Sequence, residues 1–247
     1  MLKGIDIIFE DEDFLFINKP SGLLSIPDRF DKKQQNLYTI LKECYNKIFV
    51  VHRLDKETSG IICFAKNAET HRELNTLFET RKIKKSYLAL VDGKVENDCG
   101  IIDIPIELNS KIFKLSKSNI VSKDSITEYK LLEKFKNYSL LEVFPKTGRT
   151  HQIRIHLSSI GHPLAIDSLY GRRDKIYLSK IKPNYKFSGK EKPLMNRLTL
   201  HSYKIEFFYS KKNKLLTFTA PLPENFQILL KQLRRYNSEL LNTEVGI

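Results

Sequence analysis

One aspartate of this sequence lies among positive charges, in the segment VHRLDKETSG at residues 51–60. Arg53 and Lys56 lie close to Asp55 on either side, and His52 lies three residues before it. A Thr-Ser-Gly turn follows and leads into an apolar run that is typical of a buried strand. Nearby cations favour the ionised form of a carboxyl group. The sequence therefore raises the question of what a charged carboxylate does at the start of a core strand.

A second segment, KTGRTHQIRIHLSSIGHP at residues 146–163, gathers cations around the start of a predicted helix. Thr150 is predicted to be the N-cap of this helix, and a Gly and a Pro end it. His151, Arg154 and Ser158 are three and four residues apart, so they share one helix face. Free backbone N–H groups at a helix start attract anions. The segment therefore indicates a phosphate-binding site; the alternative is a surface helix with polar decoration.

Other chemistries find less support in the sequence. Ser59, His52 and Asp55 could supply a Ser-His-Asp hydrolase, but the G-x-S-x-G turn of such enzymes is missing. His151 and His156 are five residues apart and do not converge on one metal ion, and the three cysteines form no C-x-x-C pair. No glycine-rich nucleotide-binding pattern occurs. We therefore expect neither a metal nor an organic cofactor.

The charge of the chain favours a polyanionic partner. Its 247 residues include 42 Lys and Arg against 29 Asp and Glu, a formal net charge of +13. Nucleic acid is the first candidate for such a protein, ahead of an anionic membrane, although a lysine-rich genome can also load a surface with charge. The sequence has no signal peptide and no apolar run of about 18 residues. We therefore expect a cytoplasmic protein that does not enter a membrane.

Local patterns predict a mixture of strands and helices. Strands are expected at residues 5–9, 14–18, 60–65 and 86–91, with two more within 125–144. Asn36 and Asn67 are predicted to cap two helices, the second of which runs to about Arg81. The first of these helices has apolar residues at helical spacing, among them Cys44, which we expect to lie in the core.

The order of these elements has no regular βαβ alternation, so an α+β fold with a mixed sheet is expected rather than a doubly wound one. No linker interrupts residues 1–247, which we interpret as a single domain. Residues 171–197 are rich in Lys and Arg with little periodicity and are predicted to form a long basic loop. A final amphipathic helix is predicted at about residues 224–242.

Several segments together resemble one family. HRLDKETSG resembles the signature of the RluA family of pseudouridine synthases. Other segments resemble further motifs of that family in the same order, namely INKPSGLLSIP (17–27), KSYLALVDG (85–93), TGRTHQIRIHLSSIGHPLAIDSLYG (147–171), and LTLHSYKIEF (198–207) with FTAPLP (218–223). They cover about residues 14–223. The resemblance implies a mixed, bent sheet with an active-site cleft across its face, and site-specific isomerisation of uridine to pseudouridine in structured RNA.

The resemblance also implies catalytic roles for three residues. Asp55 matches the family's catalytic aspartate, which acts against the ribose either at the sugar carbon or at the 2′ proton. Arg154 matches the arginine that pairs with this aspartate and keeps it charged. Tyr87 matches the tyrosine that stacks on the base and assists proton removal from carbon 5. The competing hypothesis is a non-catalytic RNA-binding or RNA-chaperone protein on the same fold.

Four further residues are expected to contact RNA. Arg53 matches the family arginine that holds the target nucleotide out of its stack. Lys19, Arg149 and His151 are candidates for phosphate contacts. The substrates implied by the resemblance are ribosomal RNA or transfer RNA, and we expect a monomer that lacks an accessory N-terminal RNA-binding domain. One departure from the family pattern is Ile166, which stands where a glycine is usual and puts the conformation of that loop in question.

Overall fold

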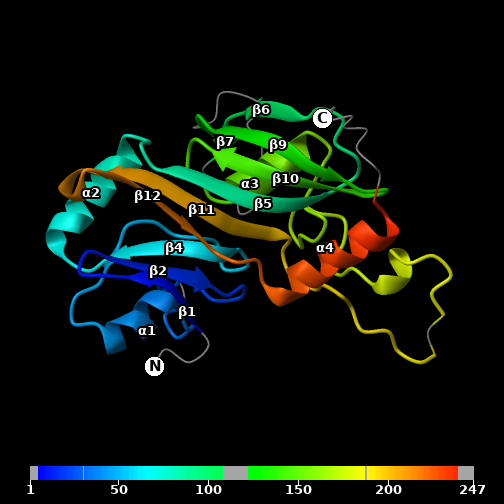
Figure 1. The fold of residues 1–247 in the computed structure, drawn as a ribbon, viewed down its shortest axis with the longest axis horizontal. Coiled ribbons are helices and arrows are strands. Elements are labelled where there is room, and N and C mark those ends of the chain that lie inside the picture. Colours follow the sequence, from blue (N-terminus) through cyan, green and yellow to red (C-terminus); the bar gives the residue numbers. More distant parts are fainter. Residues whose placement is uncertain (1–4, 30, 108–121, 187, 239–247) are drawn as a thin grey trace, which may run out of the picture. The chain divides into compact units, whose positions relative to one another are not determined.

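The computed structural model describes residues 5–29, 31–107, 122–186 and 188–238. The chain divides into two compact units, one of residues 1–87 and 200–222 and the other of residues 88–199 and 223–247. Each unit combines strands with helices (Figure 1), which confirms the α+β class. The single domain over residues 1–247 stays a prediction.

The first unit is built on a mixed sheet. Its elements are, in chain order, β1 (Asp6–Glu10), β2 (Phe14–Lys19), α1 (Leu37–Cys44), β3 (Phe49–Val50), β4 (Ser59–Ala65), α2 (Ala68–Glu79), β11 (Leu200–Tyr209), the 3-10 turn η2 (Ser210–Lys212) and β12 (Lys214–Thr219). The strand order is β1-β2-β4-β11, with β3 paired to β4 and β12 to β11. β4 and β11 are parallel, and the other pairs are antiparallel. The predicted mixed sheet is therefore confirmed.

Aromatic rings form much of the core of this unit. Phe14 and Phe16 on β2 are fully buried, as is Tyr209 on β11. The rings of Phe16 and Phe218 stack with their centroids 3.9 Å apart, and those of Phe14 and Tyr209 meet edge-on at 4.7 Å. Such pairs add about 0.5–1.5 kcal/mol each to the gain from burial. This core fixes β2 and β4, the two strands next to the loops that carry the candidate site.

The helix starts of the first unit agree with the sequence, and one helix end does not. The side chains of Asn36 and Asn67 each accept the N–H three residues later at 2.9 Å, so both predicted N-caps are confirmed. Helix α1 has only eight residues and buries Leu37 and Leu41. Cys44, its last residue, is exposed, so its predicted place in the core is wrong.

The second unit contains a largely antiparallel sheet. Its elements are β5 (Lys84–Asp92), which begins in the first unit, β6 (Cys99–Asp103), β7 (Ile106–Glu107), β8 (Ser122–Lys123), β9 (Ile126–Lys134), β10 (Tyr138–Pro145), α3 (Gln152–Ser159), the 3-10 turn η1 (Leu178–Lys180) and α4 (Glu224–Tyr236). The strand order is β5-β10-β9-β6, and β7 pairs with β8. Helix α3 packs against β9 and β10. The two strands predicted within 125–144 are confirmed as β9 and β10, whereas β6, β7 and β8 were not predicted.

The predicted basic loop at residues 171–197 has a folded core of its own. The N–H of Ile176 donates to the carbonyl of Met195 at 2.9 Å, and both side chains are buried. The charged residues between them lie on a segment that is tied down at both ends and contains η1. Helix α4 ends at Tyr236, earlier than the predicted residue 242, and residues 239–242 lie outside the described residues.

Candidate active site

Asp55 lies in a tight turn between β3 and β4, in the first unit. The N–H of Thr58 donates to the carbonyl of Asp55 at 3.1 Å and closes the turn. Leu54 is buried, whereas Asp55 is partly exposed and Arg53 is exposed. The apolar Leu54 therefore anchors the turn in the core and leaves its two charged neighbours accessible.

The first motif, residues 17–27, holds the backbone just before Asp55. The hydroxyl of Ser25 donates to the carbonyl of Leu54 at 2.8 Å and accepts the N–H of Leu54 at 3.0 Å. Ser25 is itself buried. A buried hydroxyl with both functions satisfied is costly to displace, because moving it would leave polar groups unpaired. Leu54 is therefore fixed through both of its backbone groups.

The same motif holds the backbone just after Asp55. The carbonyl of Lys56 accepts the N–H of Gly22 at 2.9 Å and the ammonium of Lys19 at 3.0 Å. Gly22 has a φ of 87°, a left-handed conformation that glycine adopts without strain. Asp55 thus stands between two residues whose backbones are fixed, which limits the directions its carboxylate can take.

Lys19 has a different role from the one predicted. Its side chain is fully buried, and its ammonium donates to the carbonyls of Pro20 at 2.9 Å, Leu23 at 2.6 Å and Lys56 at 3.0 Å. An ammonium has three N–H bonds, and three carbonyls match them here. The predicted phosphate contact is therefore corrected: Lys19 orders the loop that holds the Asp55 turn.

Gly60 ends the signature segment where two strands come very close. It pairs with Ser202 in the parallel contact of β4 with β11 and has a φ of 112°. A Cβ at this position would overlap the backbone carbonyl of Ser202. The glycine is therefore required by the close approach of the strands, and it sets the direction from which the chain leaves the Asp55 turn.

Tyr87 lies on β5 near Asp55 within the first unit. Its side chain is almost completely buried. Burial raises the pKa of Tyr87 to about 12, a hydrogen bond with Ser202 acts in the opposite direction, and the charge of Asp55 raises the pKa further. The phenol is therefore neutral near pH 7. The structure thus brings together two of the three predicted catalytic residues.

The groups of the alternative hydrolase are engaged elsewhere. The hydroxyl of Ser59 is hydrogen-bonded to the ring of His201 at 2.9 Å. The ring of His52 accepts the N–H of Cys63 at 2.9 Å and stacks on Phe78. Burial and the charge of Lys85 lower the pKa of His52 to about 3, so the ring is neutral, as an acceptor must be. These contacts give His52 a structural role.

Arg154 lies on α3, in the second unit, and forms a buried ion pair with Asp167. Its Nε and Nη2 donate to the two carboxylate oxygens, each at 2.7 Å. The two side chains are 5% and 1% exposed. Burial would raise the pKa of Asp167, but the hydrogen bonds and charge of Arg154 outweigh it and the pKa lies below its ordinary value. Sequence reasoning missed Asp167 as a partner, and the predicted pair of Arg154 with Asp55 stays a prediction.

The predicted polar face of α3 packs around one tyrosine. His151 is hydrogen-bonded to the hydroxyl of Tyr170 at 3.0 Å, and the guanidinium of Arg154 lies 5.1 Å from the centre of its ring. Ser158 donates to the backbone carbonyl of Tyr170 at 3.2 Å. Tyr170 and Asp167 both belong to the sequence IDSLYG, which closes the third motif. That motif is the signal by which they could have been found.

The start of α3 differs from the prediction. The N-cap is His151, with a left-handed φ of 55° and no capping hydrogen bond from its side chain, so the predicted Thr150 cap is wrong. The side-chain oxygen of Gln152 accepts the N–H of Arg149 at 3.0 Å and so fixes the backbone just before the helix. Ile166 is buried and its backbone is not left-handed, so the loop does not need the usual glycine there. The phosphate contacts of Arg149 and His151 stay predictions.

Within the described residues, no group of three or more His, Cys, Asp or Glu side chains could hold a metal ion. Nor do those residues contain a helix long and apolar enough to cross a membrane.

Comparison with known proteins agrees with the motifs. The family model described as RNA pseudouridylate synthase matches residues 13–159. The chain is 39% identical to ribosomal large subunit pseudouridine synthase D of Borreliella burgdorferi, over 96% of this chain and 71% of that protein. It is 34% identical to the dual-specificity RNA pseudouridine synthase RluA of Vibrio vulnificus, over 87% of this chain and 82% of that protein.

A solved structure shares the fold. Human RNA pseudouridylate synthase domain containing 4 superposes with a TM-score of 0.70 at 23% identity, over 92% of each chain. The chain belongs to the RNA pseudouridylate synthase family, and the resemblance to its RluA group is confirmed. It is an isomerase that converts uridine in RNA to pseudouridine, and the non-catalytic alternative is not favoured.

Proposed function

We propose that this protein modifies chosen uridines of ribosomal RNA and that Asp55 is its catalytic carboxylate. The observation that carries the assignment of Asp55 is its turn, which residues 17–27 hold on both sides and in which the carboxylate lies close to Tyr87. Ribosomal RNA is proposed because relatives such as the Borreliella burgdorferi protein are named ribosomal large subunit pseudouridine synthases. We also propose that the protein acts as a monomer in the cytoplasm.

The reaction exchanges one bond of the ribose for another. The bond from N1 of uracil to C1′ breaks, the uracil turns in place, and a bond from C5 to C1′ forms. The proton of C5 is lost and N1 gains one, so neither redox chemistry nor a cofactor is needed. Asp55 acts on the ribose, and attack at C1′ and removal of the 2′ proton both use the same carboxylate. Its orientation therefore matters in either route.

Tyr87 and three cations complete the proposed site. The ring of Tyr87 packs against the uracil, and its raised pKa means that the resting form is a neutral phenol. The resemblance assigns to Arg154 the role of keeping Asp55 ionised, since a guanidinium paired with a carboxylate favours its charged form. Arg53, exposed beside Asp55, fills the space that the extruded uridine leaves. Arg149 contacts a neighbouring phosphate.

The test replaces Asp55 by Asn and uses Asp6→Asn as the matched control, since Asp6 is an exposed carboxylate on β1. The substrate is an unmodified transcript of large-subunit ribosomal RNA carrying tritium at C5 of uridine. We expect tritium release by the wild type and the control, and a loss of at least about a thousandfold in Asp55→Asn with RNA binding retained. Activity of Asp55→Asn within tenfold of wild type would remove Asp55 from its role. Release from a transfer RNA transcript alone would replace ribosomal RNA as the substrate.

A further inference from the structure

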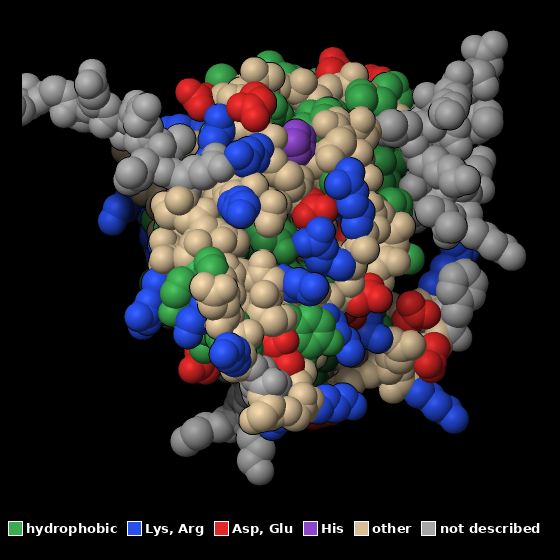
Figure 2. Space-filling model, turned by 90° about the vertical axis from the view of Figure 1, so that its right-hand side faces the viewer, with side chains coloured by type: hydrophobic (Ala, Val, Ile, Leu, Met, Phe, Trp, Pro, Cys, Tyr) green, Lys and Arg blue, Asp and Glu red, His purple; other side chains and the backbone are tan. Residues whose placement is uncertain are grey.

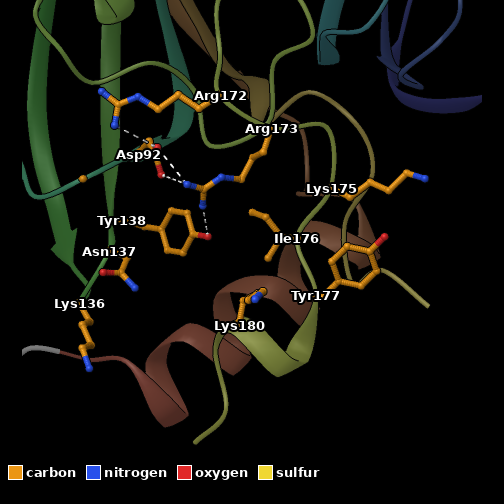
Figure 3. A pocket seen from close by; sticks show the side chains of 11 residues that line it. Asp92, Lys136, Asn137, Tyr138, Arg172, Arg173, Lys175, Ile176, Tyr177 and Lys180 are labelled. Atoms are coloured by element: carbon orange, nitrogen blue, oxygen red, sulfur yellow. Dashed lines mark hydrogen bonds and ion pairs between the residues drawn. The ribbon is translucent and has the colours of Figure 1, made fainter. Parts of the chain in front are cut away.

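A basic pocket of about 650 Å³ lies in the second unit, within the size range of small-molecule sites. Three segments line it: the end of β5 at Asp92, the turn between β9 and β10, and the basic loop around η1 (Figure 3). None of Asp55, Tyr87 and Arg154 is among its lining residues. The pocket is therefore distinct from the proposed catalytic residues.

One wall of the pocket is a fixed ion-pair cluster. Arg173 donates to Asp92 at 3.1 Å and to the hydroxyl of Tyr138 at 2.6 Å, and its guanidinium lies over the Tyr138 ring at 5.4 Å. Arg172 lies 3.5 Å from the same carboxylate and is 64% exposed. Asp92 is therefore covered and largely neutralised by the two arginines, so it does not repel an anion in the pocket.

The rest of the pocket presents positive charge. Its other cations are Lys136, Lys175 and Lys180, and none of them forms an ion pair with any residue that the structure describes. Five cations against one carboxylate line the pocket in all. Figure 2 looks onto the side where α4 and η1 lie in Figure 1, and many Lys and Arg side chains reach the surface there with acidic ones among them. Three lysines without acidic partners favour a phosphate group.

Aromatic and apolar surface lies next to these lysines. The side chain of Ile176 is buried at the pocket wall, and Tyr177, the residue before η1, is partly exposed beside it. Figure 3 shows the ring of Tyr177 on the same side of the pocket as Ile176 and Lys175. Asn137 adds an amide that can both donate and accept a hydrogen bond. Cations beside an aromatic ring are the combination that binds unpaired nucleotides.

We propose that this pocket binds one unpaired nucleotide of the RNA substrate, outside the uridine that is modified. Its phosphate contacts Lys136, Lys175 and Lys180, and its base stacks on Tyr177. The proposal rests on the proposed function only in taking RNA as the ligand. The pocket thereby gives the enzyme a contact with the RNA apart from the target uridine, which favours substrates that carry an unpaired nucleotide.

The experiment measures binding of the unmodified large-subunit ribosomal RNA transcript to Tyr177→Ala, Tyr177→Phe and the control Tyr185→Ala. Tyr185 belongs to the same basic loop but does not line the pocket. Stacking of one base contributes about 1–3 kcal/mol, so Tyr177→Ala should weaken binding at least about fivefold, while Tyr177→Phe and Tyr185→Ala should not. The single-turnover rate at saturating enzyme should stay unchanged in all three. Equal affinities of Tyr177→Ala and Tyr185→Ala would overturn the proposal.

Two double variants that remove the same number of charges test the phosphate contacts. Lys175→Gln with Lys180→Gln should reduce the salt dependence of RNA binding by about 0.7 in logarithmic slope, as expected when the one phosphate in the pocket is no longer neutralised. Lys130→Gln with Lys231→Gln makes the same change in charge at exposed positions outside the pocket and should alter the slope less. Equal slopes in the two double variants would overturn the phosphate assignment.

Two further arms separate the possible failures. The first asks whether free AMP or UMP raises the unfolding temperature of the wild type but not that of Tyr177→Ala. If it does, and if Tyr177→Ala also binds RNA as tightly as the wild type, the pocket is a mononucleotide site and the RNA assignment is overturned. Binding is also measured in the Asp55→Asn protein, which does not turn over. If the wild type forms no pseudouridine but binding still depends on Tyr177, the proposed function fails and the pocket assignment holds.

Discussion

Replacing Asp167 by Asn keeps the shape of the side chain and removes the charge from a buried ion pair. One oxygen of Asp167 accepts N–H groups of Arg154, Leu169 and Tyr170 at 2.7, 2.9 and 3.1 Å, and the other accepts the Nε–H of Arg154 at 2.7 Å. An asparagine has one oxygen and one NH₂ group for these two positions. In either orientation the NH₂ group faces an N–H donor, so the variant loses a charge and gains a repulsive contact.

The size of the effect follows from burial. The two side chains are 5% and 1% exposed, and breaking such a buried pair costs about 3–5 kcal/mol. Glu133 and Arg234 form a pair of the same two-bond geometry, at 2.8 and 2.6 Å, but their side chains are 29% and 54% exposed. Exposed pairs contribute about 0–1 kcal/mol. Glu133→Gln is therefore the matched control for Asp167→Asn.

Urea unfolding at several pH values tests this reasoning. The pKa of Asp167 lies below its ordinary value of 3.8, so the pair stabilises the fold above that pH and loses its effect as the pH falls through the lower folded value. The difference between wild type and Asp167→Asn should be constant between about pH 5 and pH 8 and narrow below about pH 4. A difference no larger than that of Glu133→Gln at pH 7 would refute the argument from burial.

Two further substitutions act on the loop and turn around Asp55. Lys19→Met keeps most of the side-chain volume but removes the donor to three carbonyls. Because the variant no longer buries a charge, part of this cost is offset, and we expect the free energy of unfolding in urea to fall by about 2–4 kcal/mol. The single-turnover rate should also be slower. A single-turnover rate equal to that of the wild type would show that the Asp55 turn does not depend on Lys19. Gly60→Ala should cost about 3 kcal/mol or more, since its Cβ meets the Ser202 carbonyl and its φ of 112° strains any other residue; an unchanged unfolding midpoint would contradict this.

The parts of the fold that the sequence predicted correctly depend on local signals. Asn36 and Asn67 cap helices through the amide three residues later, and such a contact is encoded within one turn. The predicted cap of α3 was wrong because the start of this helix depends on distant contacts. Helix α3 begins after a left-handed His151, and Gln152 accepts the N–H of Arg149 and donates to Thr127, on a strand 25 residues earlier.

The roles of two site residues could not be predicted because they depend on contacts distant in sequence. Lys19 resembles a surface cation until the carbonyl of Lys56, 37 residues later, is placed against it. The pair of Arg154 with Asp55, assigned by resemblance, stays a prediction, and the structure adds Asp167 against the same guanidinium through the fold of the intervening loop. In both cases the motif was recognised in the sequence, but the atoms it brings together depend on tertiary structure.

The hydrogen bonds that surround Asp55 have a consequence for protein engineering. The nine residues HRLDKETSG are not a portable unit, because the backbone on either side of the aspartate is held by a loop about 30 residues upstream in the chain. A transplant of the signature into another scaffold must carry residues 19–25 with it, including Lys19, whose buried ammonium donates to three backbone carbonyls. Conversely, mutations introduced into that loop are expected to shift the backbone on both sides of Asp55, so the loop and the turn cannot be varied independently.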